Sequence, residues 1–548
     1  MKRNSLNTNN HDIVAPRLKQ AQLLEEYERR IANNESQRFI ANDIEVPRSN
    51  LRHWEYRKNN IPMPKKIVEL LESPDGQTFL HIILTAIHYV FVETGGCGIR
   101  LITSFLKFSK LHNFIGPSYE SQRQYTKKME EKTIEFGAKQ DEKLGKLMPK
   151  KKITMANDET HHPTPCLVGM DVVSNFILIE KYSEKKDADA WNKSFETAVK
   201  NFNVDVFQVT SDQGSGIVKH VEQHLQAHQS PDLFHIQNDI TKGISGRLST
   251  LIQSAQSSYH KAFEALNKYK EKNKQDEVKL KKLNDRLNQA KKNLDKCLSD
   301  AHKVKQAKQQ IGHSYHPYDI YTGEANSSNK LKTELTNQFD QVDAIAKEIN
   351  LKELGKNKLK KARKMVSSMV KTFDFYWNMV SIMITSFMLT TGISKVFQKI
   401  LIPIQYLTLA KRKAKNAKSR KKIDYAISKL EEQLNNDISW HTQTKDQQAD
   451  LFSKALQCAN IFQRSSSCVE GRNGHLSLRH HGLHNISDRK LRVLTIIHNY
   501  QIRRADETTA AERFFEQKHD DLFEYLVRNM PYPPRPGKLK KEALKMSA

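Results

Sequence analysis

The chain has 548 residues, which is long enough for three or more domains that each bury a core of their own. Its 89 Lys and Arg residues outnumber its 62 Asp and Glu residues, and the resulting net charge of +27 favours a polyanionic partner, most often nucleic acid. The five cysteines are scattered and form no CxxC pair, which argues against a disulfide framework or a zinc ribbon and fits a reducing compartment.

Residues 1–72 are predicted to form a helix-turn-helix DNA-binding region. Pro47 would lie in the first turn of the second helix. The apolar residues expected in the core are Phe39, Ile40, Ala41, Ile44, Val46, Leu51 and Trp54. The second helix would expose residue types that suit base edges and phosphates in a major groove, namely Arg48, Ser49, Asn50 and Arg52. A helix pair that binds no DNA is the alternative interpretation.

Residues 73–149 are predicted to form a second helical region and a linker. Within it, residues 98–116 belong either to a second helix-turn-helix or to a helical connector. Two apolar segments, residues 79–92 and 373–393, raise the question of a membrane span. The first is too short to cross a bilayer and the second carries Asp374 and Asn378, so both are expected to be buried core helices. The polar N-terminus has no apolar signal segment, and secretion is not expected.

Residues 150–240 change to a strand pattern. Short apolar runs predict strands at residues 153–157, 166–173 and 176–182, and a fourth that starts at Val204. Residues 187–201 and 217–226 read as helices. The order strand, strand, strand, helix, strand, helix is that of the ribonuclease H fold, a mixed sheet in which carboxylates on the first and fourth strands lie side by side.

Carboxylates follow two of these strands. Asp158 ends the first and Asp212 ends the fourth, although a turn or N-cap role is the alternative for Asp212. Two such aspartates repel each other unless cations lie between them, and oxygen-ligated Mg²⁺ or Mn²⁺ suits the cluster. Glu470, in a segment expected to be helical, is the candidate third carboxylate. Asp171 is an alternative first carboxylate, and Glu512 is an alternative third one.

Three short motifs resemble those of bacterial insertion-sequence DDE transposases. They are Asp-Glu-Thr at residues 158–160, Thr-Ser-Asp at residues 210–212 and Val-Glu-Gly-Arg-Asn at residues 469–473. The resemblance implies that Asp158, Asp212 and Glu470 hold two Mg²⁺ or Mn²⁺ ions per site and catalyse phosphodiester cleavage and strand transfer. Two such metals can activate a water or a 3′-hydroxyl on one side of a phosphodiester and stabilise the leaving oxygen on the other.

A fourth motif, Ser-Pro-Asp-Leu-Phe-His at residues 230–235, is similar to an Asp-x-x-His signature that several transposase superfamilies place on the fifth strand. This similarity implies an accessory role near the site for Asp232 and His235. A capping aspartate and a core histidine are the alternatives. Arg472 and Asn473, which follow Glu470, are expected to bind phosphate beside the metals.

Residues 241–464 are predicted to be a helical insertion. A heptad spacing from Leu266 to Val304, with a polar interruption at Asn273 and Asp276, predicts a coiled-coil arm. Residues 312–328 would form a loop, and residues 331–351 would return antiparallel to the arm. DDE transposases with interrupted catalytic domains commonly have such an insertion. Trp440 is expected in the core, with stacking on an unpaired base as the alternative.

A basic run near the end of the insertion is expected to contact phosphates, although a solvated helix face is the alternative. It consists of Lys411, Arg412, Lys413, Lys415, Lys418, Arg420, Lys421 and Lys422. Residues 465–530 would hold the closing part of the catalytic domain and the C-terminal helices. Residues 531–548, which are rich in proline and then in lysine, are expected to form a disordered basic tail.

These patterns predict an α/β plus α protein: a ribonuclease H-like mixed sheet, interrupted by a large all-helical insertion, with an N-terminal helix-turn-helix region. The expected protein is a DNA transposase that binds double-stranded DNA at element ends and at the target as a homodimer or higher oligomer. We expect it in the cytoplasm, associated with the nucleoid, with no membrane partner. A non-catalytic transposase-derived DNA-binding regulator and a metal-dependent nuclease without strand transfer are the alternatives.

Overall fold

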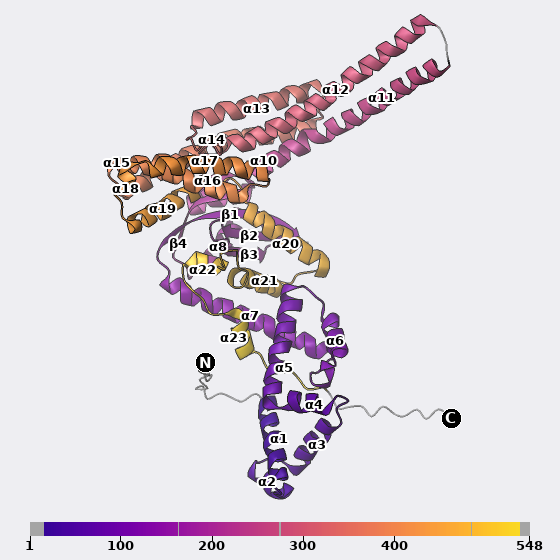
Figure 1. Ribbon diagram of the computed structural model, residues 1–548, viewed down its shortest axis with the longest axis vertical. Helices are drawn as coiled ribbons and strands as arrows, with labels where there is room; N and C mark the ends of the chain where they lie inside the picture. Colours follow the sequence, from indigo (N-terminus) through magenta and orange to yellow (C-terminus); the bar gives the residue numbers. More distant parts are fainter. Residues whose placement is uncertain (1–15, 163, 273–275, 484, 537–548) are drawn as a thin grey trace.

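The protein is elongated, with a helical region at each end and one mixed sheet between them (Figure 1). A computed structural model describes residues 16–162, 164–272, 276–483 and 485–536. Among these residues most of the structure is helical, and the strands form a single five-stranded sheet. No helix in the described ranges is long and apolar enough to cross a membrane, and the two apolar segments at residues 79–92 and 373–393 instead contribute buried side chains to helical cores.

The N-terminal end begins with three short helices around a small core. Ser36 caps the second helix by accepting a hydrogen bond from the Phe39 backbone N–H, and the third helix begins directly after Pro47. Ile40, Ala41 and Leu51 are buried as expected, but Phe39 is 61% exposed and lies against the Arg30 guanidinium instead of in the core. The helices are α1 (Pro16–Ala32), α2 (Gln37–Asp43) and α3 (Arg48–Asn59).

The next helices link this end to the sheet. Residues 118–147, which are polar in sequence, form one long helix, α7, that Ser118 caps. Within residues 98–116, the helix α6 is followed by the short helical turn η2, and α7 begins just beyond them. The elements are α4 (Lys65–Glu72), α5 (Pro74–Ile87), η1 (His88–Thr94), α6 (Ile99–Phe108), η2 (Leu111–Asn113) and α7 (Tyr119–Leu147).

The C-terminal segment 531–536 returns to the N-terminal end and packs there, so the expectation of a disordered tail is wrong for these residues. Arg535 forms an ion pair with Glu72 at 2.8 Å, and the Pro534 carbonyl accepts a hydrogen bond from the Gly116 N–H. The Tyr532 ring stacks on the ring of His81 at 4.5 Å. These charged and aromatic contacts hold the segment in place, and its prolines restrict the backbone conformations that it can adopt. The expected basic tail beyond it, residues 537–548, lies outside the described residues.

The sheet has the strand order β3-β2-β1-β4-β5. β1 pairs antiparallel with β2, and β2 antiparallel with β3, through a turn in which Asn175 takes a positive φ of 62°. β4 runs parallel to β1, and β5 parallel to β4. The strands are β1 (Lys151–His162), β2 (Thr164–Asp171), β3 (Ile177–Tyr182), β4 (Val204–Ser211) and β5 (His228–Pro231).

Helices cover both faces of the sheet, because side chains alternate between the faces along each strand. Met155 and Leu167 face a core that includes Trp191, while Ala156 and Val168 face a core formed with α20 and α21. The elements around the sheet are α8 (Ala188–Val199), α9 (Ser215–Lys219), η3 (His220–Leu225), α10 (Leu233–Ile240), η4 (Thr241–Ser245), α20 (Ser467–Leu483), α21 (Asp488–Tyr500) and α22 (Ala510–Phe515). The last helix, α23 (Leu522–Asn529), packs on α7 and α5.

The insertion between the sheet and α20 is helical, as predicted, and its arm is a hairpin of two helices side by side (Figure 1). The polar interruption marks the end of the arm, because α11 ends at Glu271 and the Asp276 side chain caps α12. The predicted polar interruption thus lies where α11 ends and α12 begins; Asn273 itself lies outside the described residues. The helices are α11 (Gly246–Glu271), α12 (Glu277–Ser314), α13 (Ser328–Glu348) and α14 (Glu353–Ser386).

The rest of the insertion packs against α14 in one large apolar core. Three residues of α10, Leu233, Ile236 and Ile240, belong to this core, so α10 joins the end of the sheet to the insertion. The remaining elements are α15 (Thr391–Val396), η5 (Phe397–Leu401), α16 (Ile402–Lys413), α17 (Ala417–Asn435), α18 (Ile438–His441) and α19 (Lys445–Asn460).

Candidate active site

Asp158 and Asp212 lie at the same level of two adjacent parallel strands. Ala156 of β1 pairs with Thr210 of β4, and the same register carried two residues further brings Asp158 level with Asp212. Because residues two apart in a strand face the same side, Asp158 faces the same side as Ala156, which packs in the core that contains α20. The sequence correctly placed Asp212 after β4, whereas Asp158 lies inside β1 and not at its end.

Glu470 lies in the first turn of α20, the helix on that side of the sheet. Its carboxylate reaches the imidazole of His235, with Oε1 at 3.2 Å from Nε2. Single ligand atoms of Asp158, His235 and Glu470 all lie within 4.8 Å of one another. Three residues that are far apart in the sequence thus form one cluster at the end of the sheet.

The electrostatics of this cluster disfavour an ionised Asp158. The pKa of Asp158 is raised to about 7, mainly by burial and also by the nearby carboxylates of Glu470 and Asp212, against a lowering by its hydrogen bond from the Glu159 N–H. The hydrogen bond to Glu470 is the main cause that raises the pKa of His235 above its usual value. A positive charge would therefore stabilise the ionised carboxylates of the cluster, and His235 supplies only part of that charge.

Asn473 lies one turn beyond Glu470 and joins the cluster. Its amide nitrogen donates a hydrogen bond to Asp158 Oδ2 at 2.8 Å. Its carbonyl oxygen Oδ1 is buried and has no hydrogen-bond partner among the described residues. A buried acceptor without a partner is costly, so this oxygen is suited to a ligand that donates or is positive. The prediction of Asn473 as a residue near the site is consistent with this position.

Asp232 lies next to the cluster but has a structural role. Its Oδ1 caps α10 by accepting a hydrogen bond from the Phe234 N–H at 2.7 Å, and its Oδ2 accepts hydrogen bonds from the backbone N–H and the hydroxyl of Ser466. These bonds hold the start of α10 against the segment before α20. The capping interpretation of Asp232 is therefore confirmed. His235 lies in α10 and not on the fifth strand, which ends at Pro231.

Arg472 points away from the cluster, and the expectation that it binds phosphate is wrong. Its guanidinium forms two hydrogen bonds with the Glu180 carboxylate of β3, at 2.7 and 2.6 Å, and only 5% of the residue is exposed. A buried arginine with a bidentate partner is not available to a ligand. Of these neighbours in α20, Asn473 thus belongs to the site, whereas Arg472 holds the helix on the sheet. The sequence did not reveal this difference.

The two alternative carboxylates have local partners of their own. Asp171, at the end of β2, is 1% exposed and accepts hydrogen bonds from the backbone N–H and the hydroxyl of Ser174 in the hairpin turn. Glu512 forms a capping box with Thr509 at the start of α22. Neither residue is part of the cluster around Asp158. The structure therefore favours Asp158 and Glu470 over these alternatives.

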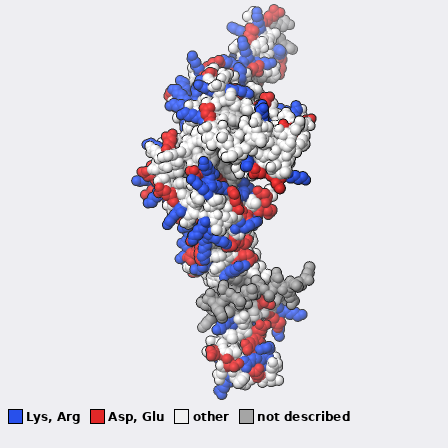
Figure 2. Space-filling view, turned by 90° about the vertical axis from the view of Figure 1, so that its left-hand side faces the viewer, with Lys and Arg blue, Asp and Glu red and all other residues white. Residues whose placement is uncertain are grey.

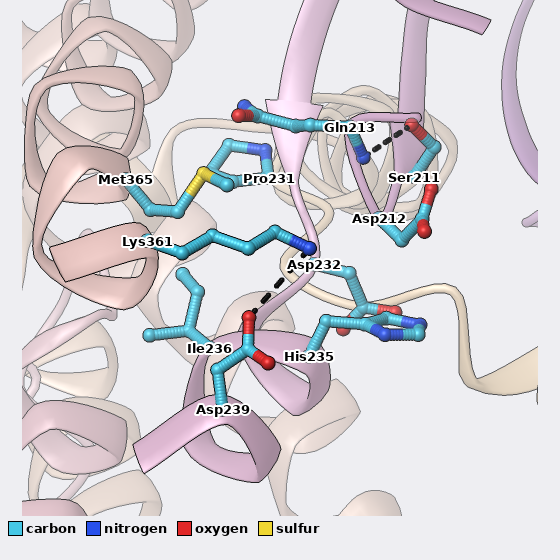
Figure 3. Close-up of a pocket in the computed structure, with 10 residues that line it drawn as sticks. All are labelled: Ser211, Asp212, Gln213, Pro231, Asp232, His235, Ile236, Asp239, Lys361 and Met365. Atoms are coloured by element: carbon cyan, nitrogen blue, oxygen red, sulfur yellow. Dashed lines mark hydrogen bonds and ion pairs between the residues drawn. The ribbon is translucent and has the colours of Figure 1, made fainter. Parts of the chain in front are cut away.

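A pocket opens beside the cluster, between the ends of β4 and β5 and the helices α10 and α14 (Figure 3). Asp212 and His235 line it from the sheet side, and Lys361 and Met365 line it from the insertion. Gln213, directly after Asp212, takes a positive φ of 62°, and the Asp212 Oδ1 accepts a hydrogen bond from the Gly214 N–H. Sequence reasoning missed Lys361, because it lies in a lysine-rich stretch of α14 in which no position stands out.

The predicted DNA-binding residues are exposed in two separate places. Arg48, Ser49 and Asn50 begin α3, and all three are exposed together with Arg52. The basic run spans the end of α16 and the start of α17, and most of its members are exposed. They are Lys411, Arg412, Lys413, Lys415, Lys418, Arg420, Lys421 and Lys422. Figure 2 shows Lys and Arg side chains on both sides of a largely uncharged area of the insertion.

Trp440 belongs to the core of the insertion. It is 5% exposed, and its ring packs edge to face on Phe452 at 5.5 Å. The expectation of a buried tryptophan is confirmed, and stacking on an unpaired base is excluded for this arrangement.

Comparison with known proteins adds one match. Residues 397–542 match the model of DUF6399, a family of unknown function. This stretch runs from η5 through Glu470 and Asn473 to the C-terminal segment, and it leaves out the whole sheet. No curated protein and no solved structure matches the chain. The geometry of the site is therefore the basis for any functional assignment.

Proposed function

We propose that this protein is a DNA transposase of the DDE class with a ribonuclease H-like catalytic domain. The observation that carries the proposal is that Asp158 and Glu470 meet, together with His235, at one end of the sheet, and that Asp212 lies close enough to raise the pKa of Asp158. The three carboxylates come from β1, the end of β4 and α20, and the whole insertion separates the last two in the chain. The strand order and directions, with β1 to β3 antiparallel and β4 and β5 parallel to β1, support the same assignment.

The residues of the cluster fit a divalent cation. Carboxylate oxygens are the ligands that Mg²⁺ and Mn²⁺ prefer, and Asp158, Asp212 and Glu470 supply them. The raised pKa of Asp158 and the unpartnered carbonyl oxygen of Asn473 both indicate a site that lacks positive charge. An imidazole at the same place suits Mn²⁺ at least as well as Mg²⁺. We propose that the three carboxylates hold two such ions.

Bound divalent ions would activate a water or a 3′-hydroxyl and stabilise the leaving oxygen of a phosphodiester. The residues of this chain position the ligands for that chemistry. Asn473 holds the Asp158 carboxylate through Oδ2, and His235 holds the Glu470 carboxylate through Oε1. Ser466 and Asp232 fix the two segments that carry His235 and Glu470 relative to each other.

Two exposed basic surfaces would bind double-stranded DNA on this proposal. The exposed face of α3 carries Arg48, Asn50 and Arg52 for the element end, and the basic run between α16 and α17 would contact the phosphate backbone. Joining two ends to a target requires at least two copies of the chain. We therefore propose that the active form on DNA is a homodimer or a higher oligomer.

The test uses a linear duplex that contains the gene with several hundred base pairs of its flanking DNA on each side. Cleavage and joined products are measured with Mg²⁺ or Mn²⁺ for the wild type, Asp158→Asn, Asp212→Asn and Glu470→Gln, and Glu512→Gln serves as the matched control. We expect the three site variants to lose cleavage by roughly 10³-fold or more while DNA binding survives, because they remove metal ligands. Glu512→Gln should cleave like the wild type.

Each alternative predicts its own result. A wild type that cuts but yields no joined product indicates a nuclease without strand transfer. A wild type that binds the flanking DNA and never cuts indicates a regulator. Full activity of Asp158→Asn, Asp212→Asn or Glu470→Gln would show that the cluster is not the catalytic site.

A further inference from the structure

Lys361 of α14 extends across the pocket beside the carboxylate cluster. Figure 3 shows its side chain reaching from the insertion toward Asp239 and the turn that carries Asp232. His235 and Asp239 both belong to α10, which forms that side of the pocket. Half of the side chain, 51%, is exposed. Asp212, at the end of β4, lines the same pocket. A cation from the insertion therefore lies at the mouth of a site whose other charged lining residues are acids and one histidine.

Asp239 holds Lys361 only loosely. The Lys361 Nζ lies 3.7 Å from Asp239 Oδ2, whereas the Lys358 Nζ lies 3.3 Å from Asp239 Oδ1. One carboxylate cannot neutralise two ammonium groups, so the group of three carries an excess positive charge. Asp239 is largely buried, and Lys358 remains paired with it. Lys361 can therefore move away without leaving a buried carboxylate that has no partner.

The packing around Lys361 fixes its position relative to the site. α14 packs on α10, and the same apolar core contains Ile236 of α10 and the partly buried Met365 of α14. His235 is the residue before Ile236, so the helix that carries part of the cluster also carries the surface on which α14 rests. The insertion thus places the backbone of Lys361 at the rim of the pocket that Asp212 and His235 also line, while its side chain is half exposed.

We propose that Lys361 binds a phosphate group of the DNA next to the carboxylate cluster, with Lys358 as the group that keeps Asp239 paired. This inference rests on the proposed function, since it assigns a substrate contact at the same site. The proposed metal ions would bind the scissile phosphate and not its neighbour. A lysine ammonium within hydrogen-bond distance would neutralise the negative charge of that neighbouring phosphate. The helical insertion then contributes directly to the active site as well as to the shape of the molecule.

The simpler reading is that Lys361 only ties α14 to α10 through Asp239. The two readings differ in what a second substitution does. If the ion pair is purely structural, Asp239→Asn should restore a Lys361→Gln protein, because the buried carboxylate that lost a partner is then neutral. If Lys361 binds phosphate, the double variant should remain defective.

The experiment compares Lys361→Gln, Lys361→Arg, Lys361→Gln with Asp239→Asn, and the control Lys364→Gln. Lys364 is an exposed lysine of the same helix that does not line the pocket. Single-turnover cleavage of the gene-with-flanks duplex should fall about 10- to 100-fold in Lys361→Gln and in the double variant, with Lys361→Arg retaining most of the rate. Lys364→Gln should cleave like the wild type, and thermal unfolding should show all variants folded.

A second measurement does not depend on cleavage. Binding of the same duplex is followed by fluorescence anisotropy in Ca²⁺ over a range of salt concentrations. The slope of log affinity against log salt should become shallower by about 1 in Lys361→Gln and stay unchanged in Lys364→Gln, because one phosphate contact is lost. If the wild type never cuts but Lys361→Gln still shows this shallower slope, the phosphate contact is supported while the proposed enzymatic function is not.

Other outcomes overturn the inference and leave the proposed function standing. Cleavage by Lys361→Gln at the wild-type rate with an unchanged salt slope would show that Lys361 does not contact the DNA. Equal losses in Lys361→Gln and Lys364→Gln would indicate general attraction by a basic helix. Rescue of cleavage by Asp239→Asn would show that the lysine has only a structural role.

Discussion

Two aspartates of paired strands, Asp158 inside β1 and Asp171 at the end of β2, have very different surroundings. Both have a pKa raised by burial. Asp171 is fully paired within its own hairpin, because the backbone N–H and the hydroxyl of Ser174 both donate to it. Asp158 lies among other titratable groups from distant parts of the chain, Glu470 and His235.

The comparison separates a carboxylate that stabilises the fold from one that is available to a ligand. The partners of Asp171 are local and neutral, so its role ends with the turn that it holds. The neighbours of Asp158 include a carboxylate that repels it, and such repulsion persists in a folded protein only where something else compensates for it. Burial and a raised pKa are shared by both residues, and only the neighbours distinguish them.

The largest expected difference between the two aspartates is in cleavage. Asp158→Asn should reduce metal-dependent cleavage by roughly 10³-fold, because it removes a proposed metal ligand. Asp171→Asn should still cleave, although it loses about 1–3 kcal/mol of unfolding free energy with its turn. Cleavage assays and urea unfolding of both variants check this pair, and the reverse pattern would make Asp171 the first carboxylate.

The same contrast is expected on α20, between Arg472 and Asn473. Arg472→Met should destabilise the protein by about 3–5 kcal/mol, because it leaves the buried Glu180 carboxylate without a charged partner. Asn473→Ala should reduce cleavage with little change in stability, since its side chain holds Asp158 and has an unpartnered oxygen. Urea unfolding monitored by circular dichroism gives the first result. A stable Arg472→Met protein would contradict the structural role of the pair.

Divalent cations should stabilise only the Asp158 region. At a Mn²⁺ concentration about 100 times the dissociation constant, the wild type should gain about 2–3 kcal/mol, seen as a higher unfolding temperature that a chelator reverses. Asp158→Asn should lose most of this gain. Asp171→Asn should keep it in full, and an equal loss in both variants would place the cation elsewhere or show that the effect is general.

A last expected effect is on the dependence of stability on pH, and it is small for any single pH unit. The pKa of Asp158 is about 7 in the fold and ordinarily 3.8, so the native state keeps a proton that the unfolded state releases between these values. With a chelator present, the free energy of unfolding should therefore fall as the pH rises from 3.8 to about 7, by roughly 1 kcal/mol per pH unit. Mn²⁺ should flatten this slope in the wild type. A slope that is the same in Asp158→Asn would show that other groups cause it.

Much of the local structure could be predicted from residue patterns. The alternation of apolar residues gave the first four strands, Ser36 and Asp187 mark helix starts, and Ser174 and Asn175 mark the turn between β2 and β3. These signals are local, because caps and turns depend on side chains that bond to their own backbone. The heptad pattern correctly indicated long paired helices, but it did not show where the chain reverses between α11 and α12.

The sequence by itself determined the elements, the basic charge and the carboxylate candidates of this protein, because each depends on residues close together in the chain. Only the tertiary structure decided which neighbours each polar group has. It paired Arg472 with Glu180, made Asp232 the cap of α10, brought His235 to Glu470 and placed Lys361 of the insertion in the same pocket as Asp212. These contacts join segments that are far apart in sequence, and they depend on how α10, α14 and α20 pack around the end of the sheet.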